Sequence, residues 1–117
     1  MTSNSSVAVN LNFIHRRGDT FVRELQFFAD QSYVTPLNIS TDTFKLQVKH
    51  NGAVIMEFAT SAGLSIEGSD TVKLTKTAVE MQIPPGTYRY DLQKTSSTGV
   101  VTTVLAGDFI IEKDITS

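Results

Sequence analysis

The chain has 117 residues, with ten Lys and Arg against twelve Asp and Glu, giving a formal net charge of -2. Because no basic excess is available to neutralise a phosphate backbone, we expect no nucleic-acid partner. Cysteine is absent, which excludes disulfide scaffolds, thiolate zinc sites and cysteine nucleophiles.

The chain begins with a polar segment, and residues 1–6 are predicted to form an arm outside a single domain at residues 7–117. The segment lacks the basic and apolar regions of a signal peptide. No run of about 18 apolar residues follows, so we expect no membrane partner. The arm either lies along its own domain or is ordered by a neighbouring subunit, and the sequence leaves both possibilities open.

Short stretches of alternating apolar and polar residues predict seven to nine strands at near-regular spacing. This pattern is typical of an antiparallel sandwich or barrel. Residues 30–40 are predicted to be irregular, and residues 76–81 to form one helical turn. The predicted strands are residues 7–14, 20–28, 43–50, 53–59, 64–66, 72–74, 88–95 and 100–111.

Apolar residues at every second position of these strands predict one buried face for each of them. The residues expected in the core are Phe21, Leu25, Phe27, Phe44, Leu46, Val48, Tyr90, Leu92 and Phe109.

Two glycine-containing segments predict turns. Arg17-Gly18-Asp19 spells the integrin-binding tripeptide, but three residues recur by chance. We interpret it as a turn, because Gly18 adopts positive φ without strain and Asp19 can bond its own backbone. Asn51-Gly52 predicts a type I′ hairpin, because both residues tolerate positive φ.

The stretch from Pro84 to Tyr88 predicts a sharp corner followed by a strand. Pro84 and Gly86 lie just upstream of Tyr88. A tyrosine in this position is typical of the tyrosine corner of immunoglobulin-like sandwiches, whose hydroxyl bonds back to the upstream chain. The alternative is an ordinary core tyrosine. Together with the strand pattern, this predicts an all-β, immunoglobulin-like antiparallel β-sandwich of seven to nine strands.

The residue types of common active sites are present without the spacings that chemistry requires. His15 and His50 occur in no metal-ligand pattern. There is no nucleophile elbow, calcium loop or glycine-rich phosphate loop. We therefore expect no enzyme, and no catalytic, cofactor-binding or metal-binding residues.

The order of the motifs resembles the N-terminal domain of phage baseplate upper proteins, over residues 17–115. Two departures occur: Asn38 replaces the family's Asp, and no Gly follows Ser40. The shared motifs are, in order, Gly18-Asp19-Thr20 before a Phe/Leu strand, the turn Pro36-Leu37-Asn38-Ile39-Ser40, a lysine-bearing strand with the Asn51-Gly52 hairpin, a stretch ending at Gly86 before Tyr88, and Gly99-Val100-Val101.

The resemblance implies an immunoglobulin-like virion component without catalytic residues. It implies a multicopy subunit of a tailed-phage tail, baseplate, neck or head, made in the host cytoplasm and bound to other virion proteins and to its own copies. Family members usually continue into further regions, whereas this sequence ends at Ser117, just past the last predicted strand. We therefore expect a free-standing module. The alternative is a binding module for a host surface carbohydrate or protein, with Tyr33 as its one good candidate for an exposed loop aromatic.

Overall fold

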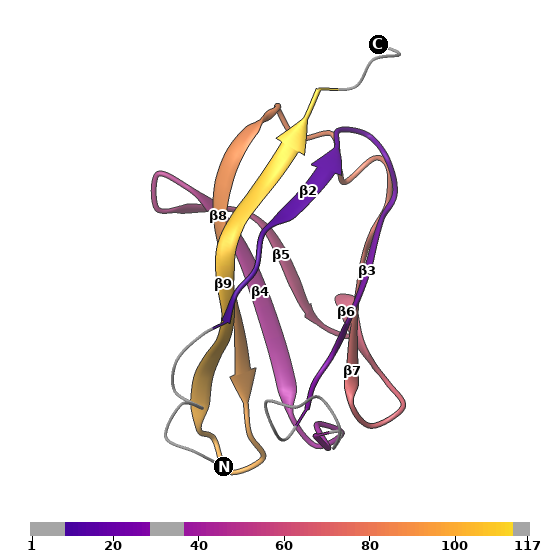
Figure 1. Ribbon diagram of the computed structural model, residues 1–117, viewed down its shortest axis with the longest axis vertical. Helices are drawn as coiled ribbons and strands as arrows, with labels where there is room; N and C mark the ends of the chain where they lie inside the picture. The colour runs from indigo at the N-terminus through magenta and orange to yellow at the C-terminus, as the bar shows by residue number, and fades with distance from the viewer. Residues whose placement is uncertain (1–8, 29–36, 114–117) are drawn as a thin grey trace.

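The computed structural model describes residues 9–28 and 37–113, which contain nine strands (Figure 1). The predicted arm at residues 1–6, the first two residues of the predicted domain, Tyr33, Pro36 and residues 114–117 lie outside the described residues. The strands are β1 (Val9–Asn10), β2 (Phe13–Arg16), β3 (Phe21–Gln26), β4 (Thr43–His50), β5 (Ala53–Thr60), β6 (Gly63–Glu67), β7 (Thr71–Lys76), β8 (Gly86–Thr95) and β9 (Val101–Glu112).

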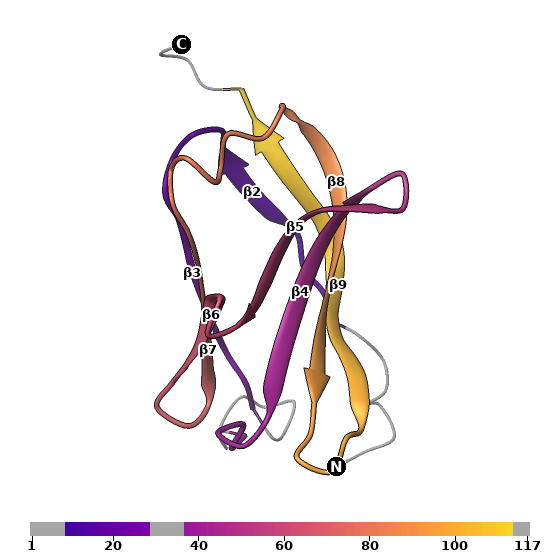
Figure 2. The same ribbon diagram turned by 180° about the vertical axis from the view of Figure 1, so that it is seen from behind.

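The strands form two layers that face each other, as Figures 1 and 2 show from opposite sides. One layer contains β9, β8, β4 and β5, with β1 and β2 along its edge, and the other contains β6, β7 and β3. The layers are joined at a corner, where the end of β5 pairs with the start of β6. Consecutive strands β3 and β4 lie in different layers, pairing with β7 and β8 respectively. This Greek-key arrangement confirms the all-β, immunoglobulin-like sandwich.

The prediction that the sandwich is antiparallel is wrong for its first strands. β1 and β2 pair in parallel with β9, where Val9 is opposite Leu105 and Phe13 is opposite Phe109. After β2 the chain crosses to the other layer instead of returning as a hairpin, so β2 can lie beside a strand that runs in its own direction. The short β5–β6 pairing is also parallel.

The predicted strand at residues 7–14 is interrupted at Leu11 and Asn12. The Leu11 amide still donates to the Ala106 carbonyl at 3.0 Å. The Asn12 side chain replaces a ladder bond by accepting from the Asp108 amide at 2.9 Å. The interruption therefore costs β9 no hydrogen bond at Asp108.

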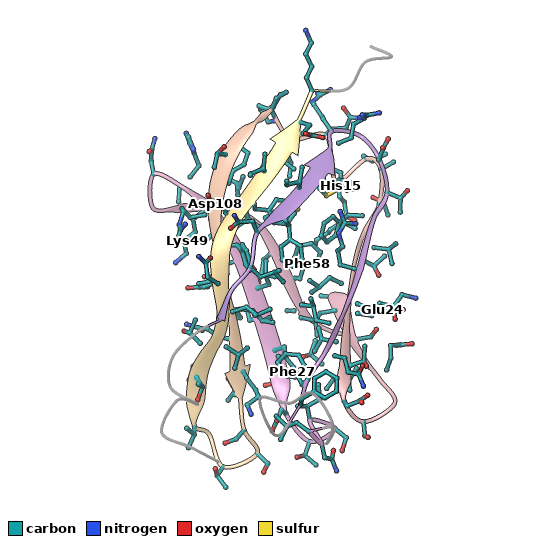
Figure 3. All side chains as sticks on the ribbon, viewed as in Figure 1. His15, Glu24, Phe27, Lys49, Phe58 and Asp108 are labelled. Carbon is teal, nitrogen blue, oxygen red and sulfur yellow. The ribbon has the colours of Figure 1, made fainter. Side chains whose placement is uncertain are left out.

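The core fills the space between the layers, where Figure 3 shows Phe58 near the middle of the sandwich. Of the predicted core residues, seven are buried: Phe21, Phe44, Leu46, Val48, Tyr90, Leu92 and Phe109. Leu25 and Phe27 are only half-buried and pack against the core from its rim. They lie in or just after β3, which among the described residues has a partner on one edge only, so these residues cover them incompletely.

The helical turn predicted at residues 76–81 starts one residue later, because Lys76 still belongs to β7; a bond of 3.1 Å from the Met81 amide to the Thr77 carbonyl closes this single turn. The Thr77 hydroxyl accepts from the Glu80 amide at 3.2 Å, and the Glu80 carboxylate accepts from the Thr77 amide at 3.0 Å. This is a reciprocal capping box. The Thr77 amide, the Thr77 hydroxyl, which donates to the same carboxylate at 3.1 Å, and the nearby Lys76 ammonium hold the pKa of Glu80 below its ordinary value.

Candidate functional site

The corner before β8 is organised by the Tyr88 hydroxyl. It donates a 2.6 Å hydrogen bond to the carbonyl oxygen of Pro84, four residues upstream. This is the backward bond that a tyrosine corner makes. Gly86 opens β8 between the two partners. The Tyr88 ring also meets the His50 ring edge to face, with centroids 5.4 Å apart.

A surface cavity of about 500 Å³ lies between this corner and the β4–β5 hairpin. Its walls are formed by residues 82–88 on one side and by His50 and Ile55 on the other. Proline and isoleucine supply apolar surface there, while the His50 imidazole and the Gln82 amide supply hydrogen-bonding groups. Such a site suits a small, largely apolar group that carries one or two polar atoms.

The β2–β3 turn lies at the same end of the molecule as the corner (Figure 1). Gly18, with φ of +83°, donates its amide to the Met81 carbonyl at 3.0 Å, and its Cα faces the Gln82 side chain. The Asp19 amide donates to the Arg16 carbonyl at 3.3 Å, which closes the turn. The structure thus joins Gly18 and Asp19 to the segment that leads into the corner.

The β4–β5 hairpin, which supplies His50 and Ile55 to the cavity wall, turns at Asn51 and Gly52. Both residues have positive φ, 51° and 82°, as a type I′ turn requires. Gly52 does not line the cavity, and a Cβ added there would meet no atom within 4 Å. Its contribution is the positive φ of the turn.

The two histidines have different surroundings. His15 is buried, meets Phe21 edge to face at 5.0 Å, and directs Nε2 to the Asp19 carbonyl oxygen at 2.8 Å. His50 is exposed at the rim of the cavity. In residues 9–28 and 37–113, no group of three or more His, Asp or Glu could hold a metal ion.

Sequence reasoning missed a second buried tyrosine bond. The Tyr90 hydroxyl donates to the Leu11 carbonyl oxygen at 2.5 Å and so ties the N-terminal strands to β8. Burial raises the pKa of Tyr90 to about 12. The bond joins residues 79 positions apart, and no local pattern could have indicated it. The capping box was also missed, although the Thr77-x-x-Glu80 spacing is a local signal for one.

Replacing Tyr88 by phenylalanine is expected to lower the free energy of unfolding by about 1–3 kcal/mol, because the Pro84 carbonyl loses its partner. Urea denaturation of the two proteins measures the difference. Thr87→Val is the matched control, since it removes an exposed hydroxyl from the next residue. An unchanged midpoint for Tyr88→Phe would reduce Tyr88 to a packing residue.

Alkaline titration tests the Tyr90 bond. The unfolded state loses this hydroxyl proton near the ordinary pKa of 10.0, whereas the folded state keeps it to about 12. The free energy of unfolding should therefore fall as the pH rises between these values. In Tyr90→Phe this component is absent, so the stability difference between the two proteins should shrink across that interval. A difference independent of pH would show that burial does not shift this group.

The fold and this geometry define an immunoglobulin-like β-sandwich domain. No family model matches the chain, and no curated protein matches its sequence. The chain is similar to a fibronectin(III)-like module of Clostridium thermocellum CbhA, at 10% identity over 92% of this chain and 93% of that one, with a TM-score of 0.43. It is also similar to the natural killer cell receptor NKp44, at 13% identity over 92% and 100%, with a TM-score of 0.45.

A third similar chain comes from a structure of T cell activation by the superantigen toxic shock syndrome toxin-1. Its identity is 14% over 86% of this chain and 92% of that one, with a TM-score of 0.46. At these scores the likenesses carry no inference about function. Among the described residues, no helix is long and apolar enough to cross a membrane.

Proposed function

We propose that the chain is a non-enzymatic structural subunit of a tailed-phage virion, built into the particle in many copies. The support is the resemblance in motif order to the N-terminal domain of phage baseplate upper proteins. The described motif residues lie at turns and corners of the sandwich: Gly18 and Asp19 between β2 and β3, Asn38 before β4, Gly52 between β4 and β5, Gly86 at the start of β8, and Gly99 between β8 and β9.

The observation that carries most weight concerns a departure from the family pattern. Asn38 occurs where the family has aspartate. Its side-chain oxygen accepts two bonds from Ser40, one from the amide at 3.0 Å and one from the hydroxyl at 2.7 Å. An aspartate oxygen accepts the same bonds in an Asx turn, so the substitution preserves the chemistry of this corner.

Turn residues are more informative about architecture than core residues are. A turn demands particular backbone conformations and side-chain acceptors, whereas a core accepts many apolar residues of suitable total volume. A shared order of turn residues therefore supports a shared architecture, and a small module repeated by symmetry is an economical building block.

The cavity beside Tyr88 favours a second function, the recognition of a carbohydrate or protein on the host surface. A module of this kind would work as a monomer, with His50 and Gln82 offering hydrogen bonds from the cavity wall. Binding to a glycan array that His50→Ala abolishes would favour this function.

Antibody labelling of particles tests the structural assignment. We expect labels at one fixed position on virions of the phage that encodes the chain, and particles of that phage lacking the gene should assemble incompletely. Complementation with Tyr88→Phe, which keeps the fold at reduced stability, should restore assembly partly. Normal, infectious particles without the protein would contradict the proposal.

A further inference from the structure

Within residues 9–28 and 37–113, strand β3 has one partner, β7, and therefore pairs on one edge. The Phe27 amide donates to the Asp70 carbonyl at 2.8 Å, and the antiparallel register continues from there along β3. Because residues in such a pair alternate in bonding direction, residues 21, 23 and 25 bond to β7. Val22, Glu24 and Gln26 then direct their backbone groups to the outer edge, where no described residue pairs with them.

Arg23 closes the upper part of this edge. Its guanidinium donates to the Ile14 carbonyl of β2 at 3.0 Å and to the Val22 carbonyl at 3.0 Å. It also lies over the Phe21 ring, 4.7 Å from the centroid. The side chain thus bridges the two layers at the level of β2, and below it no described residue pairs with the amides and carbonyls of Glu24 and Gln26.

We propose that residues 2–8 of a second copy of this chain add as a strand to the open edge of β3. The bonds would be main-chain N–H···O=C bonds to Glu24 and Gln26, as in other strand additions. This inference rests on the proposed function, because it requires that copies of the chain assemble. It specifies the contact that links one copy to the next.

The register of β1 on β9 fixes the height, relative to β3, at which β1 begins. Phe21 packs on Phe109, with ring centroids 5.4 Å apart, so these residues share a level. Leu25 and Leu105 each lie four residues below it, or about 13 Å at the usual strand rise. Val9 pairs with Leu105. A segment that continued the direction of β1 backward would therefore reach the level of Leu25 or lie below it.

Crossing from the layer of β1 to the layer of β3 would take such a segment further down. The layers of a sandwich are about 10 Å apart, which is about three extended residues. A copy's own residues 2–8 would then pass beyond Gln26, and Glu24 would be left without a partner. A segment from another copy has no such restriction, because its own β1 does not fix its height.

Charge explains why the occupant is this segment and not a second β3. Pairing two β3 edges about a two-fold axis at residue 24 would set Glu24 opposite Glu24 of the other copy, and like charges directly opposite are destabilising. Residues 2–8, Thr-Ser-Asn-Ser-Ser-Val-Ala, carry no charged side chain. Fully extended they span about 23 Å, enough to cover the open part of β3.

Disulfide trapping tests the contact on the full chain, which contains no cysteine of its own. A cysteine is placed in turn at each of residues 3–6 of a tagged protein, and Glu24→Cys is made in an untagged one. Each pair is mixed and oxidised. We expect tagged–untagged dimers, joined between the arm and β3, at a yield at least tenfold above that of a matched pair with Glu57→Cys at an exposed position of β5.

Three results would overturn the inference: no dimers, equal yields with Glu57→Cys, or trapping only within one chain when both cysteines are in the same molecule. The test uses purified protein without phage. Trapping without any virion location would therefore contradict the proposed function alone, and failed trapping with a virion location would contradict this inference alone.

A proline at Glu24 provides a second test. Proline lacks the amide hydrogen that Glu24 directs to the outer edge, so the bonds to β7 are retained. Edge strands tolerate proline at such positions. Glu24→Pro should weaken association of the full chain at least tenfold, as should deletion of residues 2–8, whereas Glu24→Thr should not. Association unchanged by both the deletion and the proline would overturn the inference.

Discussion

Replacing Phe21 by alanine is expected to lower the free energy of unfolding by about 3–5 kcal/mol, among the largest losses that one substitution in this fold should cause. Phe21 is completely buried. Its ring packs on Phe13, Phe58 and Phe109, with centroids 6.0, 5.6 and 5.4 Å away. These partners come from β2, β5 and β9 of the layer opposite β3, so the cavity left by alanine would lie between the two layers.

Urea denaturation measures this effect, with Val22→Ala as the matched control. Val22 is the next residue of the same strand but is 44% exposed, and its truncation should cost less than about 1 kcal/mol. Phe44→Ala should fall in the range of Phe21→Ala, because Phe44 is also buried. A loss below about 1 kcal/mol for Phe21→Ala would mean that the two layers do not pack around this residue.

Replacing Gly107 by alanine is expected to be the next most damaging kind of change, with a loss of about 3 kcal/mol, at the upper end for overpacking. A Cβ at Gly107 would overlap the Leu11 carbonyl oxygen and lie 2.9 Å from Asn12 Oδ1. The closest atom belongs to the backbone, so no side-chain rotation relieves the clash. The N-terminal strands would have to move away from β9.

Hydrogen exchange locates the damage. The amides of Leu11 and Asp108, both bonded across this junction, should exchange faster in Gly107→Ala, while β3 amides bonded to β7 should change little. Ala106→Ser adds one heavy atom at the neighbouring residue of β9, and its cost should stay within about 1 kcal/mol. Equal stability of Gly107→Ala and the wild type would show that the first strands are not held this closely.

Local patterns predicted most of the strands. The alternation in residues 43–50 predicted β4 with its observed bounds, and the Asn51-Gly52 dipeptide predicted the hairpin that follows. Alternation does not say which strand lies at an edge, and so the half-buried state of Leu25 was missed. The parallel pairing of β2 with β9 joins residues 96 positions apart in the chain, and no local signal encodes it.

The candidate site divides in the same way. The bond from Tyr88 to Pro84 spans four residues and could be expected from the proline, glycine and tyrosine of the corner. The cavity depends on bringing His50 beside Tyr88, which follows from the pairing of β4 with β8. Gly107 gave no signal in the sequence, because its importance comes from the approach of Leu11.

The most direct test of the central proposal, a multicopy structural subunit of a virion, is quantitative mass spectrometry of gradient-purified particles of the phage that encodes the chain. The proposal predicts that the protein remains with the particles through high-salt washing. It also predicts a fixed number of copies per particle, compatible with the particle's rotational symmetry. Purified, infectious virions that contain none of this protein would contradict the proposal.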